Sequence, residues 1–235
     1  MDARVMTSLF LLLLGGLAGL LLDGVATVIL RATWQGLTHC ERCGARLGWT
    51  ARWRRCPHCG HWPRRPWVMA GLLALVSAGL PWLGRWPVLA LWPVTACFFL
   101  HAVIDWEDRL VYTPLVSVAI LICGAIGVWM HGLASTLLGL LIGAGGMGVL
   151  YGLGVLFVRW RGLGDVWLGG LVGVVLGWPG VIAGLTLGTM LAGLYALGVV
   201  LYYALRHRQW VGEQPIPYGP FLLLGAWLLL LGQGS

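Results

Sequence analysis

Charged residues are scarce in this chain and lysine is absent: 10% of the 235 residues are charged, eight are acidic, and all 15 basic residues are arginine. Hydrophobic residues make up 59% of the sequence, more than a soluble globule of this length could bury. The composition therefore excludes an ordinary soluble enzyme and indicates an integral membrane protein. Because long apolar segments recur almost to the last residue, we expect the first one to be a membrane span and not a cleaved leader.

The arginines are unevenly distributed along the chain. Eight fall in one polar stretch after the first apolar segment: Arg31, Arg42, Arg46, Arg52, Arg54, Arg55, Arg64 and Arg65. Thirteen of the 15 fall in loops that the expected topology places on one side, and only Arg4 and Arg85 fall on the other. The positive-inside rule then predicts that the polar stretch is cytoplasmic and that both termini lie outside. The net charge of +7 reflects this bias, so membrane lipid is an expected partner and nucleic acid is not.

The expected fold is an all-α polytopic membrane protein with about eight transmembrane helices. At about 1.5 Å of rise per residue, the longer apolar segments can cross a hydrocarbon core of roughly 30 Å. The expected spans are 5–30, 67–82, 86–104, 110–130, 133–158, 166–178, 181–205 and 220–231, with Pro81 ending the second. This divides the chain into a first helix in residues 1–30, a cytoplasmic insert in 31–66 and a membrane bundle in 67–235.

The insert contains four cysteines in two matching pairs. Two residues separate Cys40 from Cys43 and Cys56 from Cys59, and twelve residues separate the pairs. This spacing is typical of a structural zinc site of the ribbon type, in which four thiolates surround the metal. Two disulfides or free thiols are the alternative, and a histidine of the insert could replace one cysteine. We expect zinc to fold the insert, because about 35 residues cannot bury a useful core alone.

Two further features have structural explanations. Asp23 lies deep in the first span, where we expect it to pair inside the helix bundle. Residues 143–148 are rich in glycine and superficially suggest a nucleotide-binding loop. They lie inside an apolar span with no preceding soluble strand, so we predict close helix packing there instead.

Two carboxylates stand where apolar segments reach the same membrane face. Asp105 comes at the end of the third expected span, in a charged loop with Glu107, Asp108 and Arg109. Asp165 ends the short glycine turn that starts at Gly162. Taken alone, Asp165 could cap the next helix, and Asp105 could be a solvated interfacial charge. Taken together, they predict an aspartyl protease pair, in which one ionised and one protonated carboxyl activate a shared water.

The order of these features resembles the bacterial type IV prepilin peptidase family over nearly the whole chain. One span, a four-cysteine insert, an aspartate at the end of a span and a later Gly-x-Gly-Asp follow one another, and residues 216–221 are similar to that family's closing motif. The resemblance implies that Asp105 and Asp165 are catalytic, that Gly162 and Gly164 let the substrate backbone approach, and that the four cysteines bind zinc.

The same resemblance implies the substrate and the location. Members of the family cut the basic leader from prepilins and pseudopilins at the cytoplasmic face of the bacterial inner membrane. Many then methylate the new N-terminus, which makes S-adenosylmethionine a candidate cofactor.

The chain also departs from the family's pattern. Residues 111–113 read Val-Tyr-Thr where Leu-Pro-Asp is usual, and Trp167 stands where a lysine commonly follows. These departures leave a second hypothesis open, a scaffold or assembly protein that kept the fold after its chemistry decayed. Transport is a third and weaker hypothesis, since no pair of broken helices at mid-depth is evident in the sequence.

Overall fold

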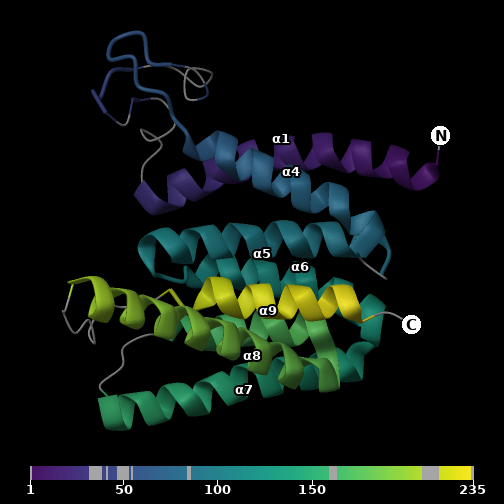
Figure 1. Ribbon diagram of the computed structural model, residues 1–235. Coiled ribbons are helices and arrows are strands. Elements are labelled where there is room, and N and C mark those ends of the chain that lie inside the picture. The colour runs from purple at the N-terminus through teal and green to yellow at the C-terminus, as the bar shows by residue number, and fades with distance from the viewer. Residues whose placement is uncertain are drawn as a thin grey trace. The chain divides into compact units, whose positions relative to one another are not determined.

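The described part of the chain is entirely helical apart from its connections. The computed structural model describes residues 2–31, 39–40, 42–46, 53, 55–83, 86–158, 163–207 and 217–233. Within these ranges, the helices are α1 (Ala3–Arg31), α4 (Arg65–Leu83), α5 (Val88–Asp108), α6 (Thr113–His131), α7 (Leu133–Val158), α8 (Gly164–His207) and α9 (Gly219–Gly232) (Figure 1). Six of them are long and apolar enough to cross a membrane, which indicates a multi-pass membrane protein.

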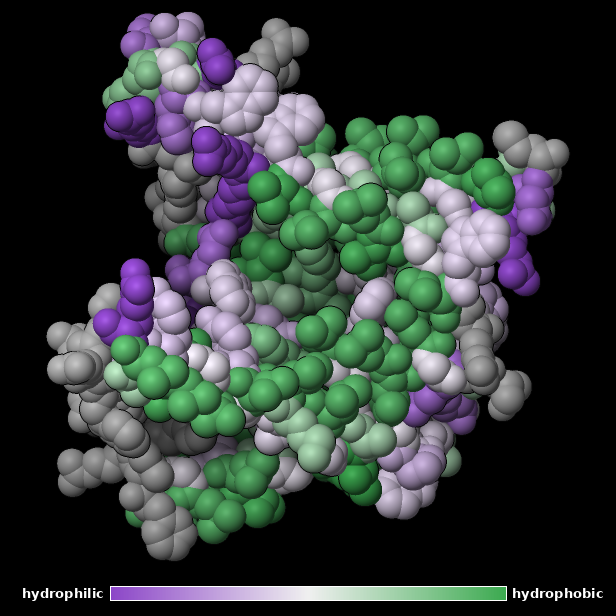
Figure 2. Space-filling view, viewed as in Figure 1, coloured by the Kyte–Doolittle hydropathy of each residue, from purple (hydrophilic) through white to green (hydrophobic). Residues whose placement is uncertain are grey.

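Large apolar side chains cover the outer surface of the helices. Leu89, Leu156 and Leu205 are each more than three-quarters exposed, at 81%, 78% and 82%. Figure 2 shows hydrophobic residues over most of the visible surface of the helices. Such a surface would be unfavourable in water, so we assign it to contact with lipid.

The expected count of eight spans is not confirmed: the expected spans 166–178 and 181–205 are the two arms of one broken element, α8. α8 covers both 166–178 and 181–205, with non-helical backbone at Gly177 (φ 61°, ψ −175°) and Trp178 (φ −89°, ψ 136°). The chain turns back at this break, since the Leu176 side chain lies against Gly184 of the second arm. The last expected span is the 14-residue α9, which is shorter than the other helices.

The chain forms two compact units, Met1–Gly84 and Arg85–Ser235. In the first, α1 packs along α4 with glycines at the closest approach. A side chain at Gly19 would meet the backbone of Ala70, so only glycine allows this distance. Asp23 is fully buried and forms an ion pair with Arg65, with 3.1 Å between Oδ1 and Nε. The expected pairing of Asp23 is therefore present, and its partner lies at the first residue of α4.

The second unit contains α5 to α9, which pack through another glycine seam. Gly139 and Gly143 of α7 lie against the backbone of Gly173 and Gly169 of α8, with no room for side chains between them. Within the glycine-rich stretch 143–148, the prediction of close helix packing therefore holds for Gly143, whereas an added Cβ at Gly145, Gly146 or Gly148 meets nothing within 4 Å. The first arm of α8, which has Asp165 in its first turn, is thus held by backbone contacts.

Two expected helix ends were wrong. Pro81 does not end the second span, because α4 continues to Leu83 with the proline inside it. Likewise, Asp105 does not lie in a charged loop: α5 continues to Asp108 and ends at Arg109, whose left-handed backbone (φ 56°) caps the helix. Asp105 is therefore on the last turn of α5 and is 7% exposed, which excludes a freely solvated charge.

Candidate functional sites

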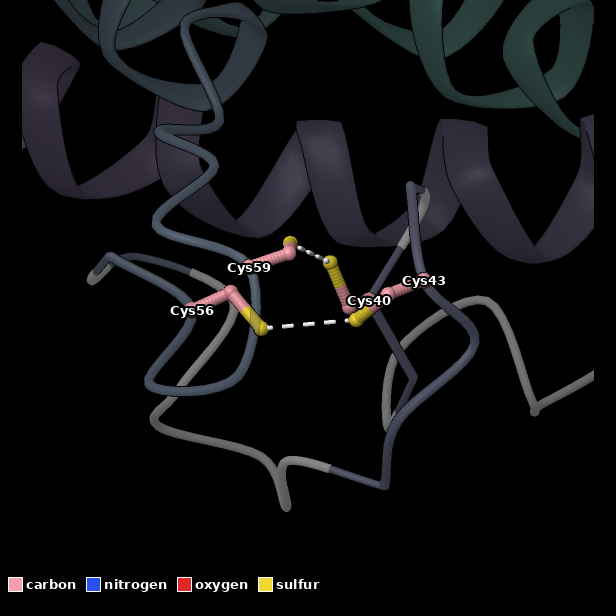
Figure 3. A group of neighbouring side chains, drawn as sticks. All are labelled: Cys40, Cys43, Cys56 and Cys59. Atoms are coloured by element: carbon pink, nitrogen blue, oxygen red, sulfur yellow. Dashed lines mark hydrogen bonds between the residues drawn. The ribbon is translucent and has the colours of Figure 1, made fainter.

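The first site is the cluster of four cysteines in the insert. The sulfur atoms of Cys40, Cys43, Cys56 and Cys59 all lie within 4.8 Å of one another (Figure 3). The Sγ atoms of Cys40 and Cys59, and those of Cys43 and Cys56, are 3.6 Å apart, and none of the four forms a disulfide. Four thiolates around a tetrahedral zinc ion lie about 3.8 Å apart. The cluster thus fits a metal ion such as zinc, in a closed site without an open position for a substrate.

The two cysteine pairs have the same backbone geometry. In each, the glycine after the second cysteine donates its N–H to the carbonyl of the first, from Gly44 to Cys40 and from Gly60 to Cys56, at 2.9 Å in both cases. Both glycines adopt left-handed backbone conformations, with φ of 69° and 68°. Only glycine adopts this conformation freely, which explains why a glycine follows each pair.

Backbone amides form hydrogen bonds to the sulfur atoms of Cys40 and Cys59 and favour their thiolate forms, which bind cations. The amides of Cys43 and Arg42 lower the pKa of the Cys40 thiol to about 6. At Cys59, the amide of His61 favours the thiolate, but burial and the neighbouring sulfurs outweigh it and raise the pKa to about 12. A bound metal ion would displace the protons that remain on these thiols.

The second site lies where α5 ends and α8 begins. Asp105 accepts a hydrogen bond at Oδ2 from the backbone N–H of Gly219, at 3.0 Å, although 114 residues separate the two. A side chain at Gly219 would lie 2.7 Å both from this oxygen and from Cδ1 of Leu168. The glycine therefore allows the first residue of α9 to contact the carboxylate directly through its backbone.

Asp165 reaches the same place from the first turn of α8. Gly164, the residue before it, packs against the Val111 side chain in the loop after α5. A Cβ atom added to Gly164 would lie 2.8 Å from this side chain. Gly219 links the two aspartates, because an added Cβ there would lie 2.7 Å both from Asp105 Oδ2 and from Leu168 Cδ1, one turn after Asp165 on α8. The structure thus brings together three of the four residues expected here, and Gly162 lies outside the described residues.

Tyr218 and Thr189 also belong to this site, although nothing in the sequence singled out Thr189. The Tyr218 hydroxyl forms a short hydrogen bond of 2.5 Å with the Thr189 hydroxyl. Burial raises the pKa of Tyr218, the Thr189 hydroxyl lowers it, and the Asp165 carboxylate raises it further. Because the net effect is a rise, the phenol stays protonated near neutral pH.

An aromatic cluster borders the carboxylates. Trp106 follows Asp105 on α5, and its ring lies 6.0 Å from that of Tyr195 and 6.3 Å from that of Phe221. The rings of Tyr195 and Phe221 are 4.7 Å apart. Since Trp106 is 51% exposed, the cluster offers an accessible apolar surface next to the two aspartates.

A separate cavity of about 800 Å³ lies at the far end of the same bundle. Its lining includes His131, Pro179 and Gln233, at the ends of α6, the first arm of α8 and α9. These helices begin next to the carboxylates, so the cavity and the carboxylates occupy opposite ends of the bundle.

Together, the fold and the two sites define a multi-pass helical membrane protein with a metal-type cysteine cluster and a pair of neighbouring carboxylates. Comparisons with protein families, with curated proteins and with solved structures found no match to this chain.

Proposed function

We propose that this protein is a membrane aspartyl endopeptidase of the prepilin peptidase type. It would cleave the basic leader of a type IV prepilin or pseudopilin at the cytoplasmic face of a bacterial inner membrane. One observation carries the proposal: Gly219 lies against both Asp105 and Leu168, the residue three positions after Asp165, so the end of α5 and the first turn of α8 meet at one point although 60 residues separate the two aspartates. A peptidase of this class needs two such carboxyls around one water, one taking a proton while the other polarises the scissile carbonyl.

The surroundings of the pair support this chemistry. The Gly219 N–H holds one oxygen of Asp105, which leaves the other oxygen of that carboxyl available to a water. The accessible rings beside Asp105 offer an apolar surface to the part of a prepilin that follows its leader.

The four cysteines would hold zinc in a structural role. Because all four positions around the metal would be filled by thiolates, we assign cleavage to the aspartates and folding of the insert to the metal. Methylation of the new N-terminus with S-adenosylmethionine is a further activity that the family resemblance suggests.

The alternative is a scaffold or assembly protein whose chemistry has decayed. The unusual residue Val111 favours it, because its side chain packs directly on Gly164 beside Asp165. A departure from the family pattern thus lies within the site itself.

A cleavage assay separates the two. Purified protein in lipid is incubated with a cognate prepilin, with and without S-adenosylmethionine, and the products are weighed by mass spectrometry. We expect a truncated product from the unchanged protein and none from Asp105→Asn or Asp165→Asn. Asp108→Asn is the matched control, since this exposed carboxylate at the end of α5 accepts a hydrogen bond from the Tyr112 hydroxyl, at 2.9 Å.

Three outcomes would decide the assignment. Cleavage by Asp165→Asn would refute the catalytic pair. No cleavage of a verified substrate by well-folded protein would favour the scaffold. An added methyl mass that depends on S-adenosylmethionine would establish the second activity.

A further inference from the structure

The insert contains a cavity that the metal-type cluster and the carboxylates do not use. Its volume is about 520 Å³, and its lining consists of Arg42, Gly60, His61, Trp62, Pro63 and Arg64. Arg42 belongs to the first cysteine pair, whereas the other residues follow the second pair. The cavity therefore exists only where the two halves of the insert come together.

The insert that contains this cavity is strongly positive in its sequence. Residues 31–65 contain eight arginines and a single acidic residue, Glu41, while the rest of the chain contains seven residues of each sign. The whole formal net charge of +7 therefore belongs to the insert. The cavity lining contains two arginines and no carboxylate, and the guanidinium of Arg55 lies 5.7 Å from the ring centre of Trp62 beside it. An anion with several oxygens is the complementary ligand.

The chain places this cavity next to the end of a membrane span. Arg64 directly precedes α4, which is apolar after its first residue. The indole N–H of Trp67, in the first turn of α4, donates to the carbonyl of Trp53 at 3.2 Å and so ties the insert to the helix. Trp62 and Trp67 are each 46% exposed, and tryptophans are enriched at membrane–water interfaces. Anions are concentrated at this depth as lipid phosphates.

We propose that the cavity between Arg42 and Arg64 binds the phosphate headgroup of an anionic phospholipid. The two guanidinium groups would contact the phosphate oxygens, and the lipid would hold the insert against the membrane surface. The same positive charge would repel a basic leader peptide, so the lipid is the better partner. This inference goes beyond the proposed function and does not depend on it.

Native mass spectrometry of the purified full-length protein in detergent tests the proposal. The protein is titrated with phosphatidylglycerol, and separately with phosphatidylcholine, which has no net charge. The variants are Arg42→Gln with Arg64→Gln and, as matched control, Arg46→Gln, which removes an exposed arginine of the insert outside the cavity. At about 1 kcal/mol for each arginine, the double variant should bind its first phosphatidylglycerol roughly 30-fold more weakly. The control should bind it as the unchanged protein does.

Four results would overturn the proposal. They are unchanged binding by the double variant, an equal loss in Arg46→Gln, equal affinity for phosphatidylcholine, and displacement of the lipid by millimolar inorganic phosphate. The metal content of each variant shows whether the insert is folded. If the glutamine pair loses its metal, Arg42→Gln alone is compared with Arg46→Gln, and equal affinities refute the site. Because cleavage is not measured, a failure here is distinct from a failure of the proposed function.

Discussion

At the scale of single residues, Gly219 is the position that most constrains the carboxylate site. Its N–H contacts Asp105, and an added methyl group would lie 2.7 Å from the same carboxylate oxygen. We predict that Gly219→Ala displaces Asp105 and lowers kcat/KM in the cleavage assay about 100-fold, as misplacement of a reacting group by 1 Å can do. Gly198→Ala is the control, because an added Cβ there meets nothing within 4 Å. Equal activities of the two variants would contradict the role of Gly219.

Tyr218 allows a prediction that includes pH. Removing its hydroxyl deletes the hydrogen bond to Thr189, and we expect Tyr218→Phe to lower kcat about tenfold, the effect of one such bond. Because the net shift raises the pKa of Tyr218 above the ordinary 10.0, the phenol is neutral on both sides of neutrality. The ratio of unchanged to variant kcat should therefore stay constant from pH 6 to about pH 9. A ratio that falls to one by pH 9 would show that the phenol ionises there.

At the scale of helices, the position of Asp165 depends on how closely α8 approaches α7. At Gly173, an added Cβ would lie 2.5 Å from the carbonyl carbon of Gly139, a backbone atom that cannot move aside. We predict that Gly173→Val lowers the unfolding free energy in detergent by about 3 kcal/mol more than Gly145→Val, where an added Cβ meets nothing within 4 Å. Thermal unfolding of both variants measures the difference. Similar melting temperatures would refute the close packing of α7 and α8 at Gly173.

The ion pair between α1 and α4 can be tested by a double-mutant cycle, because both of its residues can be replaced. Asp23 is fully buried and the Arg65 side chain is 24% exposed. We expect Asp23→Asn or Arg65→Gln alone to destabilise the protein by about 3 kcal/mol, since each leaves a charge without this partner. The double variant should cost less than the sum of the two single changes, as a double-mutant cycle by thermal unfolding can show. Additive effects would mean that the pair is not coupled.

At the scale of the whole molecule, the insert should depend on its metal. We predict that Cys40→Ser with Cys56→Ser removes one ligand from each half and abolishes zinc in the purified protein. Cys97→Ser is the control, because this cysteine lies in α5 outside the cluster. Elemental analysis measures zinc per chain, and unchanged zinc in the double variant would refute the metal site.

The sequence predicted what is encoded locally. The spacing of the cysteines and the glycine after each pair dictate the metal-type cluster without help from the rest of the chain. The length of the apolar segments likewise predicted most helices. The charged residues after Ile104 led us to expect the end of α5 too early, because Arg109, with its left-handed backbone, ends that helix after the carboxylates and not before them. Polarity marks where water begins, and a helix can extend past that point.

Contacts between distant segments could not be predicted in the same way. The bond from Gly219 to Asp105 joins residues 114 apart, and its existence depends on how α5, α8 and α9 pack. Thr189 gave no signal at all, since a threonine on a helix usually bonds its own backbone, as this one also does to Leu185 at 2.8 Å. The break at Gly177, by contrast, lies next to the boundary between two apolar segments, 166–178 and 181–205, which we expected from the sequence to be separate spans.

The ion pair between Asp23 and Arg65 also has a consequence for biosynthesis. The ribosome completes α1 well before Arg65, because the entire insert is translated between the two. α1 therefore meets the membrane while the guanidinium that neutralises its carboxylate does not yet exist. We expect chains truncated before Arg65 to integrate α1 less efficiently than longer chains, unless Asp23 is replaced by asparagine.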